Sequence, residues 1–287
     1  MKEKAILREW SRSSSGATAR LVVDKEDPFF FDHALDHVPG ILVVAGLLDL
    51  LIRTRSEGLR PDGRIKVSLD FHKFCELDDD ITVSVSPSVP ETEEEHAWEL
   101  AGTVDSSIVV SGTAVLHRKS AERFVPAAPG EHGETLAAAE LAHRESPENA
   151  LLGAAWWAEE RLLARAQRSP VGHPLRARPL VELIESARQF ATLIGHAGFE
   201  RPIGDKFILS ALEVDLWRGF TPGEVSMEWV RKPVDGRRYD LAARLFRSSG
   251  DDVDEEVGTA SFVSVIVTPC QYQTIRFRRR HVEERAI

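Results

Sequence analysis

The chain has 287 residues, and 43% of them are hydrophobic, which is ordinary for a globular protein and sufficient for two packed domains. Its 46 acidic and 36 basic residues leave a formal net charge of −10. A charge of this sign argues against nucleic acid or an anionic membrane surface as the main partner. An acidic ligand would therefore need a local basic patch.

Cysteine usage and the N-terminal segment indicate the cellular compartment. The two cysteines, Cys75 and Cys270, lie far apart in the sequence, and the segment from Met1 to Ala5 leads into charged residues rather than an apolar signal core. We therefore expect a soluble protein of the reducing cytoplasm.

A strand-like stretch at residues 19–24 leads into the most informative segment, residues 27–42. It contains two aspartate-histidine pairs, and Pro39 follows them at a position that suits the first turn of a helix. The residues after Gly40 are almost all apolar, so this helix must be enclosed on nearly all sides. At roughly 15 residues it is too short for a membrane span, and a curled sheet is the natural enclosure.

The elements that follow occur twice in the same order. Strand-like runs lie near residues 65–74, 81–85, 97–104 and 108–116. The segment after these runs is poor in aliphatic periodicity, which predicts a linker. The second half has an extended region at 151–166, a helix from about Pro179 to Gly195, and runs near 207–216, 225–230, 239–246 and 258–267. The predicted division is a first repeat at 1–120, a linker at 121–147 and a second repeat at 148–287.

An offset of 140 residues aligns the two halves in pattern. It places His33 opposite His173 and sets Ala45 opposite Glu185. The two halves therefore keep different polar groups. This difference is expected when a homodimer with two equivalent sites becomes a single chain with one working site.

The segment Asp27–His33, followed by Val38–Leu42, resembles the beta-hydroxyacyl-ACP dehydratases, in which similar elements flank a catalytic histidine. A closer resemblance is to the A-factor biosynthesis proteins, which are double-hotdog enzymes of gamma-butyrolactone signalling. It rests on residues 36–42 and 71–74 in the first half, and on 179–189 and 195–204 in the second. The repeats of that family then stand in swapped order here.

This resemblance implies an α+β fold of two tandem hotdog repeats, each an antiparallel sheet wrapped around a central helix, packed as a pseudo-dimer in one chain. It implies a substrate carried on the phosphopantetheine of acyl carrier protein, with no other cofactor. The implied reaction is beta-ketoacyl transfer to a small hydroxyl acceptor such as dihydroxyacetone phosphate. The chain would act as a monomer or a homodimer.

Two alternatives stay open, because Ala45–Asp49 replaces the Glu-Ala-Ala-Arg-Gln-like run of the family in the first repeat. One is a hotdog beta-hydroxyacyl-thioester dehydratase, in which His33 removes the alpha proton and Glu185 protonates the departing hydroxyl. The other is a non-catalytic acyl-binding or docking module.

Glu185, Arg188 and Gln189 share one face of the second helix, because they are spaced by three and four residues. One interpretation is a solvated stripe together with Glu182. The other is that Glu185 reaches the acyl tunnel with its pKa raised by burial, and acts as general acid or base. The dehydratase resemblance then implies His33 with Glu185 as the intact catalytic pair. Arg188 and Gln189 are predicted to bind substrate.

His33 and His37 each follow an aspartate that is placed to orient an imidazole. His33 is the better catalytic candidate, whereas His37 and Asp36 are predicted to bind substrate. The alternative for either histidine is a hydrogen bond to backbone inside a buried turn. Gly40 opens the helix and offers its N–H to the thioester oxygen. No metal site is expected, because residues this close in a loop rarely converge on one ion.

Arginines gather in two places, and either group is a candidate for a phosphate or an acidic carrier protein. One group is near the second helix and the other near the C-terminus; they comprise Arg176, Arg178 and Arg188, and Arg276, Arg278, Arg279 and Arg280. The alternative for the terminal run is a solvated tail.

Overall fold

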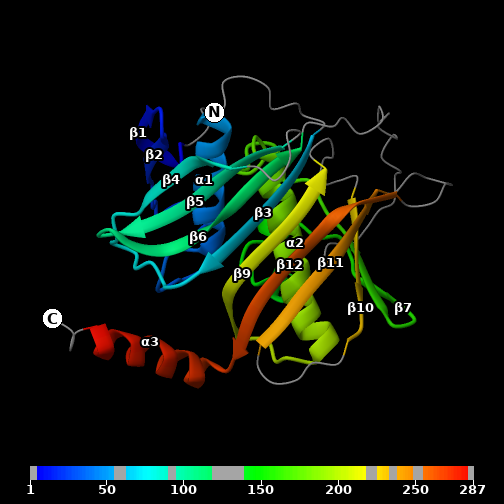
Figure 1. The fold of residues 1–287 in the computed structure, drawn as a ribbon. Coiled ribbons are helices and arrows are strands. Elements are labelled where there is room, and N and C mark those ends of the chain that lie inside the picture. Colours follow the sequence, from blue (N-terminus) through cyan, green and yellow to red (C-terminus); the bar gives the residue numbers. More distant parts are fainter. Residues whose placement is uncertain are drawn as a thin grey trace.

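The computed structural model describes residues 5–54, 63–89, 95–117, 139–217, 225–232, 238–247 and 255–283. Twelve strands in this part of the chain form one antiparallel sheet, in the order β1-β2-β4-β5-β6-β3-β9-β12-β11-β10-β8-β7. Figure 1 shows the two long helices α1 and α2 on the same side of that sheet.

The first half of the sheet is built from half-buried strands. These are β1 (Leu7–Ser13), β2 (Gly16–Leu21), β3 (Arg64–Phe71), β4 (Thr82–Ser88), β5 (Glu95–Val104) and β6 (Ser107–His117). Burial alternates in β2 and β3, whereas six of the seven residues of β1 are exposed; in β3, Ile65 and Val67 are buried and Lys66 between them is exposed. This period of two gives the sheet one apolar face, which packs on a helix.

Helix α1 (Gly40–Thr54) is buried along almost its whole length, including Leu47, Leu48 and Leu50. The sheet wraps it through contacts with β1, β2, β4 and β5. The predicted apolar helix enclosed by a curled sheet is therefore confirmed.

The second half repeats this plan. Its elements are β7 (Trp156–Ala158), β8 (Arg161–Arg165), α2 (Pro179–Leu193), β9 (Lys206–Trp217), β10 (Val225–Val230), β11 (Arg238–Arg247) and β12 (Glu255–Val267). Reading outward from the centre of the sheet, β3-β6-β5-β4-β2-β1 corresponds to β9-β12-β11-β10-β8-β7. The helices begin at residues 40 and 179, one residue short of the predicted offset. The predicted fold of two tandem hotdog repeats is confirmed.

The repeats join edge to edge where β3 pairs with β9, from Arg64 opposite Trp217 to Asp70 opposite Ala211. Arg64 also donates two hydrogen bonds to Asp215, of 2.5 and 2.7 Å, across this junction. The twelve strands therefore form one continuous sheet rather than two separate ones.

Three further segments lie outside the two sheet halves. The short helical turns η1 (Ala139–Ala142) and η2 (Pro147–Asn149) precede the second repeat, and α3 (Pro269–Glu283) follows β12. Figure 1 shows α3 projecting from the lower edge of the sheet, beneath the first repeat. Most of the predicted linker at 121–147 lies outside the described residues, and the predicted domain limits stay a prediction.

None of the helices that the structure describes combines the length and the apolar character that a membrane crossing requires.

Candidate functional site

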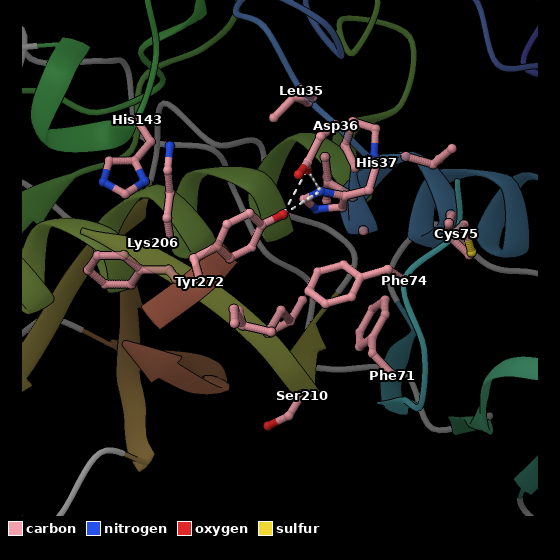
Figure 2. Close-up of a pocket in the computed structure, with 18 of the residues that line it drawn as sticks. Leu35, Asp36, His37, Phe71, Phe74, Cys75, His143, Lys206, Ser210 and Tyr272 are labelled. Carbon is pink, nitrogen blue, oxygen red and sulfur yellow. Dashed lines mark hydrogen bonds and ion pairs between the residues drawn. The ribbon is translucent and has the colours of Figure 1, made fainter. Parts of the chain in front are cut away.

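A cavity of about 730 Å³ lies between the two repeats, within the range usual for small-molecule sites. Its wall comes from the loop before α1, the end of β3, the residues before η2, the start of β9, and α3. Figure 2 shows His143 and Lys206 at one side of this cavity, and Phe71 and Phe74 at the other.

His33 lines this cavity, and Asp32 fixes its orientation. The buried Asp32 carboxylate lies 2.7 Å from His33 Nδ1 and accepts from Asn149 Nδ2 at 3.2 Å. Burial alone would raise the pKa of Asp32, but hydrogen bonds from His33 and Asn149 and the charge of Arg144 lower it. Asp32 is therefore an anion, so Nδ1 of a neutral His33 carries the proton and Nε2 keeps its lone pair.

Glu185 is fully buried, so the interpretation of a solvated stripe is wrong. The predicted raised pKa is also wrong. Burial does raise the pKa of Glu185, but the charges and hydrogen bonds of Arg188 and Arg144 outweigh it and lower the pKa to about 2. Arg144 Nη2 donates to Glu185 at 2.5 Å, and Arg188 donates through Nε at 2.7 Å and Nη2 at 2.8 Å. The Glu185 carboxylate is therefore an anion whose oxygens accept hydrogen bonds from both arginines.

The arginines also separate Glu185 from the cavity. Arg144 and Arg188 line the cavity wall, whereas Glu185 and Gln189 do not. Gln189 instead donates to Glu185 and to the carbonyl of Asn149, which fastens α2 to η2. His33 and Glu185 are connected only indirectly, through Asp32 and Arg144, which lie 3.3 Å apart. The predicted pair, His33 and Glu185, therefore lies in the same region of the protein, but the two side chains do not contact each other.

Arg144 was not singled out from the sequence, because it falls in the predicted linker. Its side chain is 4% exposed, and besides Glu185 and Asp32 it contacts the carbonyl of Phe29 at 2.8 Å. The guanidinium also lies over the Phe29 ring, 4.3 Å from its centre. Arg144 thereby ties the loop of the first repeat to the central helix of the second.

A second aspartate-histidine pair lines the same cavity. Asp36 lies 2.7 Å from His37 Nδ1 and accepts a hydrogen bond of 2.7 Å from the hydroxyl of Tyr272 on α3. Figure 2 shows the Tyr272 hydroxyl directed at both residues. Burial lowers the pKa of His37, although Asp36 counteracts this effect. The loop before α1 and the C-terminal helix therefore meet at this pair.

The interpretation of the terminal arginines as a solvated tail is wrong for Arg276. Its guanidinium donates to Glu76 at 2.9 and 3.0 Å and to the carbonyl of Asp36 at 2.9 Å. It also lies over the ring of Phe74, 4.7 Å from the centre. Tyr272 and Arg276 together hold α3 against the cavity.

Gly40 lies in the cavity wall at the first residue of α1. A Cβ at this position would lie 3.3 Å from Phe71 Cε1, so glycine leaves room for the aromatic ring. Because the first N–H groups of a helix have no partner within it, Gly40 is placed to offer such a donor to the cavity. Its predicted role as an oxyanion donor stays a prediction.

His173, which corresponds to His33 in the second repeat, forms hydrogen bonds within the protein through both ring nitrogens. His173 lies 3.2 Å from the Asn149 side-chain oxygen through Nε2, and Nδ1 accepts from the N–H of Leu175 at 3.2 Å. Burial, followed by the charge of Arg144, lowers the pKa of His173 to about 4. Both ring nitrogens are thus used, which leaves His33 as the histidine of this pair that lines the cavity.

His143 and Lys206 also line the cavity and were not predicted. His143 lies between η1 and η2, and its Nε2 is 2.9 Å from Nε2 of His196. Lys206 begins β9. No sequence periodicity pointed to these residues, since one lies in a region read as a linker and the other at a strand end.

Among the described residues, no group of three or more histidine, cysteine, aspartate or glutamate side chains is arranged to hold a metal ion.

The fold and this cavity define a tandem hotdog protein with one histidine-lined site between its repeats. The model of the A-factor biosynthesis hotdog domain matches residues 1–120 and 128–243. The chain belongs to that family. Whether its repeats stand in swapped order stays a prediction.

Solved structures share the fold at low sequence identity. The dehydratase domain of RzxB from Pseudomonas fluorescens has a TM-score of 0.60 and 14% identity, covering 92% of this chain and 98% of that one. The dehydratase domain from the CurJ module of curacin polyketide synthase has 0.59 and 13%, covering 92% and 96%. The tesB protein MAP1729c of Mycobacterium avium subs paratuberculosis has 0.53 and 12%, covering 90% and 96%. No curated protein matches this sequence.

Proposed function

We propose that this protein transfers a beta-ketoacyl group from the thioester of an acyl carrier protein to the hydroxyl of a small acceptor such as dihydroxyacetone phosphate. The observation that carries the proposal is His33 in the cavity wall, with the Asp32 carboxylate 2.7 Å from its Nδ1. No described residue hydrogen-bonds His33 Nε2, so a substrate hydroxyl has a base to meet there. Membership of the A-factor biosynthesis family supports the same reaction class.

The chemistry needs one base that later becomes an acid. His33 Nε2 takes the proton of the acceptor hydroxyl while the oxygen attacks the thioester carbonyl carbon. The carbon–sulfur bond of the tetrahedral intermediate then breaks, and the leaving thiolate takes the proton from the His33 imidazolium. The products are the acyl ester and the carrier thiol. Asp32 stabilises the imidazolium and holds the ring in one orientation, as a carboxylate does in a catalytic triad.

Two other features of the cavity fit this reaction. The N–H at the start of α1, at Gly40, is placed to bind the oxygen that becomes negative in the intermediate. Apolar side chains of the cavity wall offer a surface for the acyl chain; among them, Phe71 and Phe74 lie at the opposite side from His143 (Figure 2).

Glu185 takes a different role from the predicted general acid or base. As an anion bonded to the buried Arg144 and the half-buried Arg188, it neutralises both guanidinium groups and holds them in the cavity wall. We therefore assign the base to His33 and treat Glu185 as a positioning residue.

The same feature disfavours dehydration, the second candidate. A dehydratase would need Glu185 to give a proton to the departing hydroxyl. With its pKa lowered to about 2 by Arg188 and Arg144, Glu185 has no proton to give at neutral pH. The third candidate, a non-catalytic binding module, predicts ligand binding without turnover.

Intact-protein mass spectrometry tests the proposal. A beta-ketoacyl carrier protein is incubated with this protein, with and without dihydroxyacetone phosphate. We expect loss of the acyl group only when the acceptor is present, and a rate about 10²- to 10⁴-fold lower in His33→Ala. His72→Ala is the matched control, since His72 does not line the cavity and bonds Ser111 instead. Equal rates in His33→Ala and wild type would refute the assignment, and unloading without acceptor would refute transfer.

A further inference from the structure

A pair of histidines beside the proposed catalytic centre has fixed proton positions. Nδ1 of His196 lies 2.7 Å from the carbonyl oxygen of Arg201, which can only accept, so Nδ1 carries the hydrogen. In a neutral His196, Nε2 is therefore an acceptor. It lies 2.9 Å from Nε2 of His143, which must then be the donor. What remains on His143 is the lone pair of Nδ1.

His143 is held as a neutral ring in the cavity wall. Phe207 packs edge-on against it, with the ring centres 5.0 Å apart at 86°. Burial, and then the charges of His196, Arg188 and Lys206, lower the pKa of His143 to about 3. The ring consequently stays a hydrogen-bond acceptor at neutral pH.

Cationic side chains surround this acceptor. Figure 2 shows the Lys206 side chain beside the His143 ring, and both line the cavity. Arg188 also lines the cavity, near enough for its charge to act on His143. It spends Nε and Nη2 on Glu185, which leaves Nη1 for another partner. Its side chain is 24% exposed. One side of the cavity therefore combines a neutral acceptor with two positive donors.

We propose that His143, Lys206 and Arg188 form the acceptor subsite, which takes a small molecule that carries a phosphate group and a second hydroxyl besides the one that reacts at His33, as glycerol 3-phosphate does. The second hydroxyl donates to His143 Nδ1, and the phosphate accepts from Lys206 and Arg188. This inference rests on the proposed function, because it names where the acceptor of that transfer lies. It also explains how an acidic chain binds an anion, since the negative charges nearby, Glu185 and Asp32, are already paired.

The geometry separates this subsite from the acyl chain. The phenyl rings of Phe71 and Phe74 lie on the far side of Tyr272 from His143 and Lys206 (Figure 2). An apolar chain gains by burying its surface against those rings, whereas an anion gains beside the cations. The two ends of the cavity thus suit the two reactants of an acyl transfer.

Isothermal titration calorimetry with glycerol 3-phosphate, and with glycerol as the uncharged counterpart, tests the subsite. Because a hydrogen bond to a charged group contributes about 1.5–3 kcal/mol, we expect Lys206→Gln to weaken glycerol 3-phosphate binding about 10- to 100-fold. We expect His143→Phe to weaken it about 3- to 10-fold, because a neutral hydrogen bond contributes less. Glycerol carries no charge and should bind much more weakly. Neither change should therefore weaken glycerol binding through the loss of a charge interaction.

Lys66→Gln is the matched control. Lys66 is a lysine of β3 that pairs with Glu213 at 3.2 Å and does not line the cavity. Lys206 is exposed, so its replacement leaves the core unchanged even where His143→Phe fails to fold. Wild-type affinity in Lys206→Gln, or an equal loss in Lys66→Gln, would overturn the subsite.

The binding experiment is independent of the transfer experiment because it needs no acyl donor. Specific, Lys206-dependent binding without any acyl transfer would support the subsite and refute the proposed function. Transfer that proceeds with unchanged KM for the acceptor in Lys206→Gln would refute the subsite alone.

Discussion

Breaking the contact between Arg144 and Glu185 should expose how much the two repeats depend on it. Both side chains are buried, with 4% and 0% of their surface exposed, and their atoms lie 2.5 Å apart. Removing one partner of a buried ion pair costs about 3–5 kcal/mol when the other charge is left without compensation. Glu185 keeps its hydrogen bonds from Arg188, so we expect Arg144→Met to lower the free energy of unfolding by an amount at the lower end of this range, about 3 kcal/mol.

The double variant provides the sharper test. Each single variant removes the same Arg144–Glu185 contact, so in Arg144→Met with Glu185→Gln the loss should be smaller than the sum of the two single losses by about 1–3 kcal/mol. Urea unfolding followed by tryptophan fluorescence measures all three. The surface counterpart is Arg64→Met, which breaks the pair with Asp215; because Arg64 is 42% exposed, the cost should stay below about 1 kcal/mol.

Strict additivity would refute this reasoning, since it would mean that Arg144 and Glu185 contribute independently. A loss in Arg64→Met equal to that in Arg144→Met would refute it as well, because burial would then make no difference.

Three further outcomes follow from the same contacts. Burial lowers the pKa of His143 to about 3 and that of His173 to about 4, so the unfolded chain binds more protons than the folded one below pH 6.5. We therefore expect urea unfolding to show that stability falls by about 1.4 kcal/mol per pH unit for each histidine as the pH is lowered from 6 to 4. A flat profile would contradict their buried, neutral state. Acid should remove a further stabilisation of roughly 3 kcal/mol as pH falls from 4.5 towards 2, because the folded pKa of Glu185 is about 2, and Glu185→Gln should lack this phase. Gly112→Ala should unfold the first repeat or destabilise it by more than about 3 kcal/mol, because a Cβ would lie 1.8 Å from the Ser68 oxygen, whereas Gly102→Ala, with 3.6 Å to its nearest neighbour, should retain a wild-type melting temperature within a few degrees.

Much of the architecture could be predicted because it depends on local periodicity. The alternation in β3 and the unbroken apolar run of α1 each determine an element without reference to the rest of the chain. Strand β1 was missed because six of its seven residues are exposed, so no alternation marks it. Helix α3 was read as a tail because its sequence is rich in arginine and has no apolar stripe.

The candidate site was predicted only in part, since its electrostatics depend on residues distant in sequence. His33 and His37 stand in the loop before α1 and Gly40 begins that helix, and all three line one cavity. The state of Glu185 could not be predicted, because it is decided by Arg144, which lies 41 residues earlier in a segment without periodicity. A buried glutamate alone has a raised pKa, whereas the same glutamate between two arginines has a lowered one.

The central claim is that His33 acts as the base of an acyl transfer, while Glu185 stays an anion without a proton to give. The most direct test offers the protein a beta-ketoacyl and a beta-hydroxyacyl carrier protein in parallel, with dihydroxyacetone phosphate present, and follows both by intact mass. The account predicts that the ketoacyl carrier loses its acyl group and that the hydroxyacyl carrier does not lose water. Loss of water from the hydroxyacyl carrier, with the ketoacyl carrier unchanged, would contradict it.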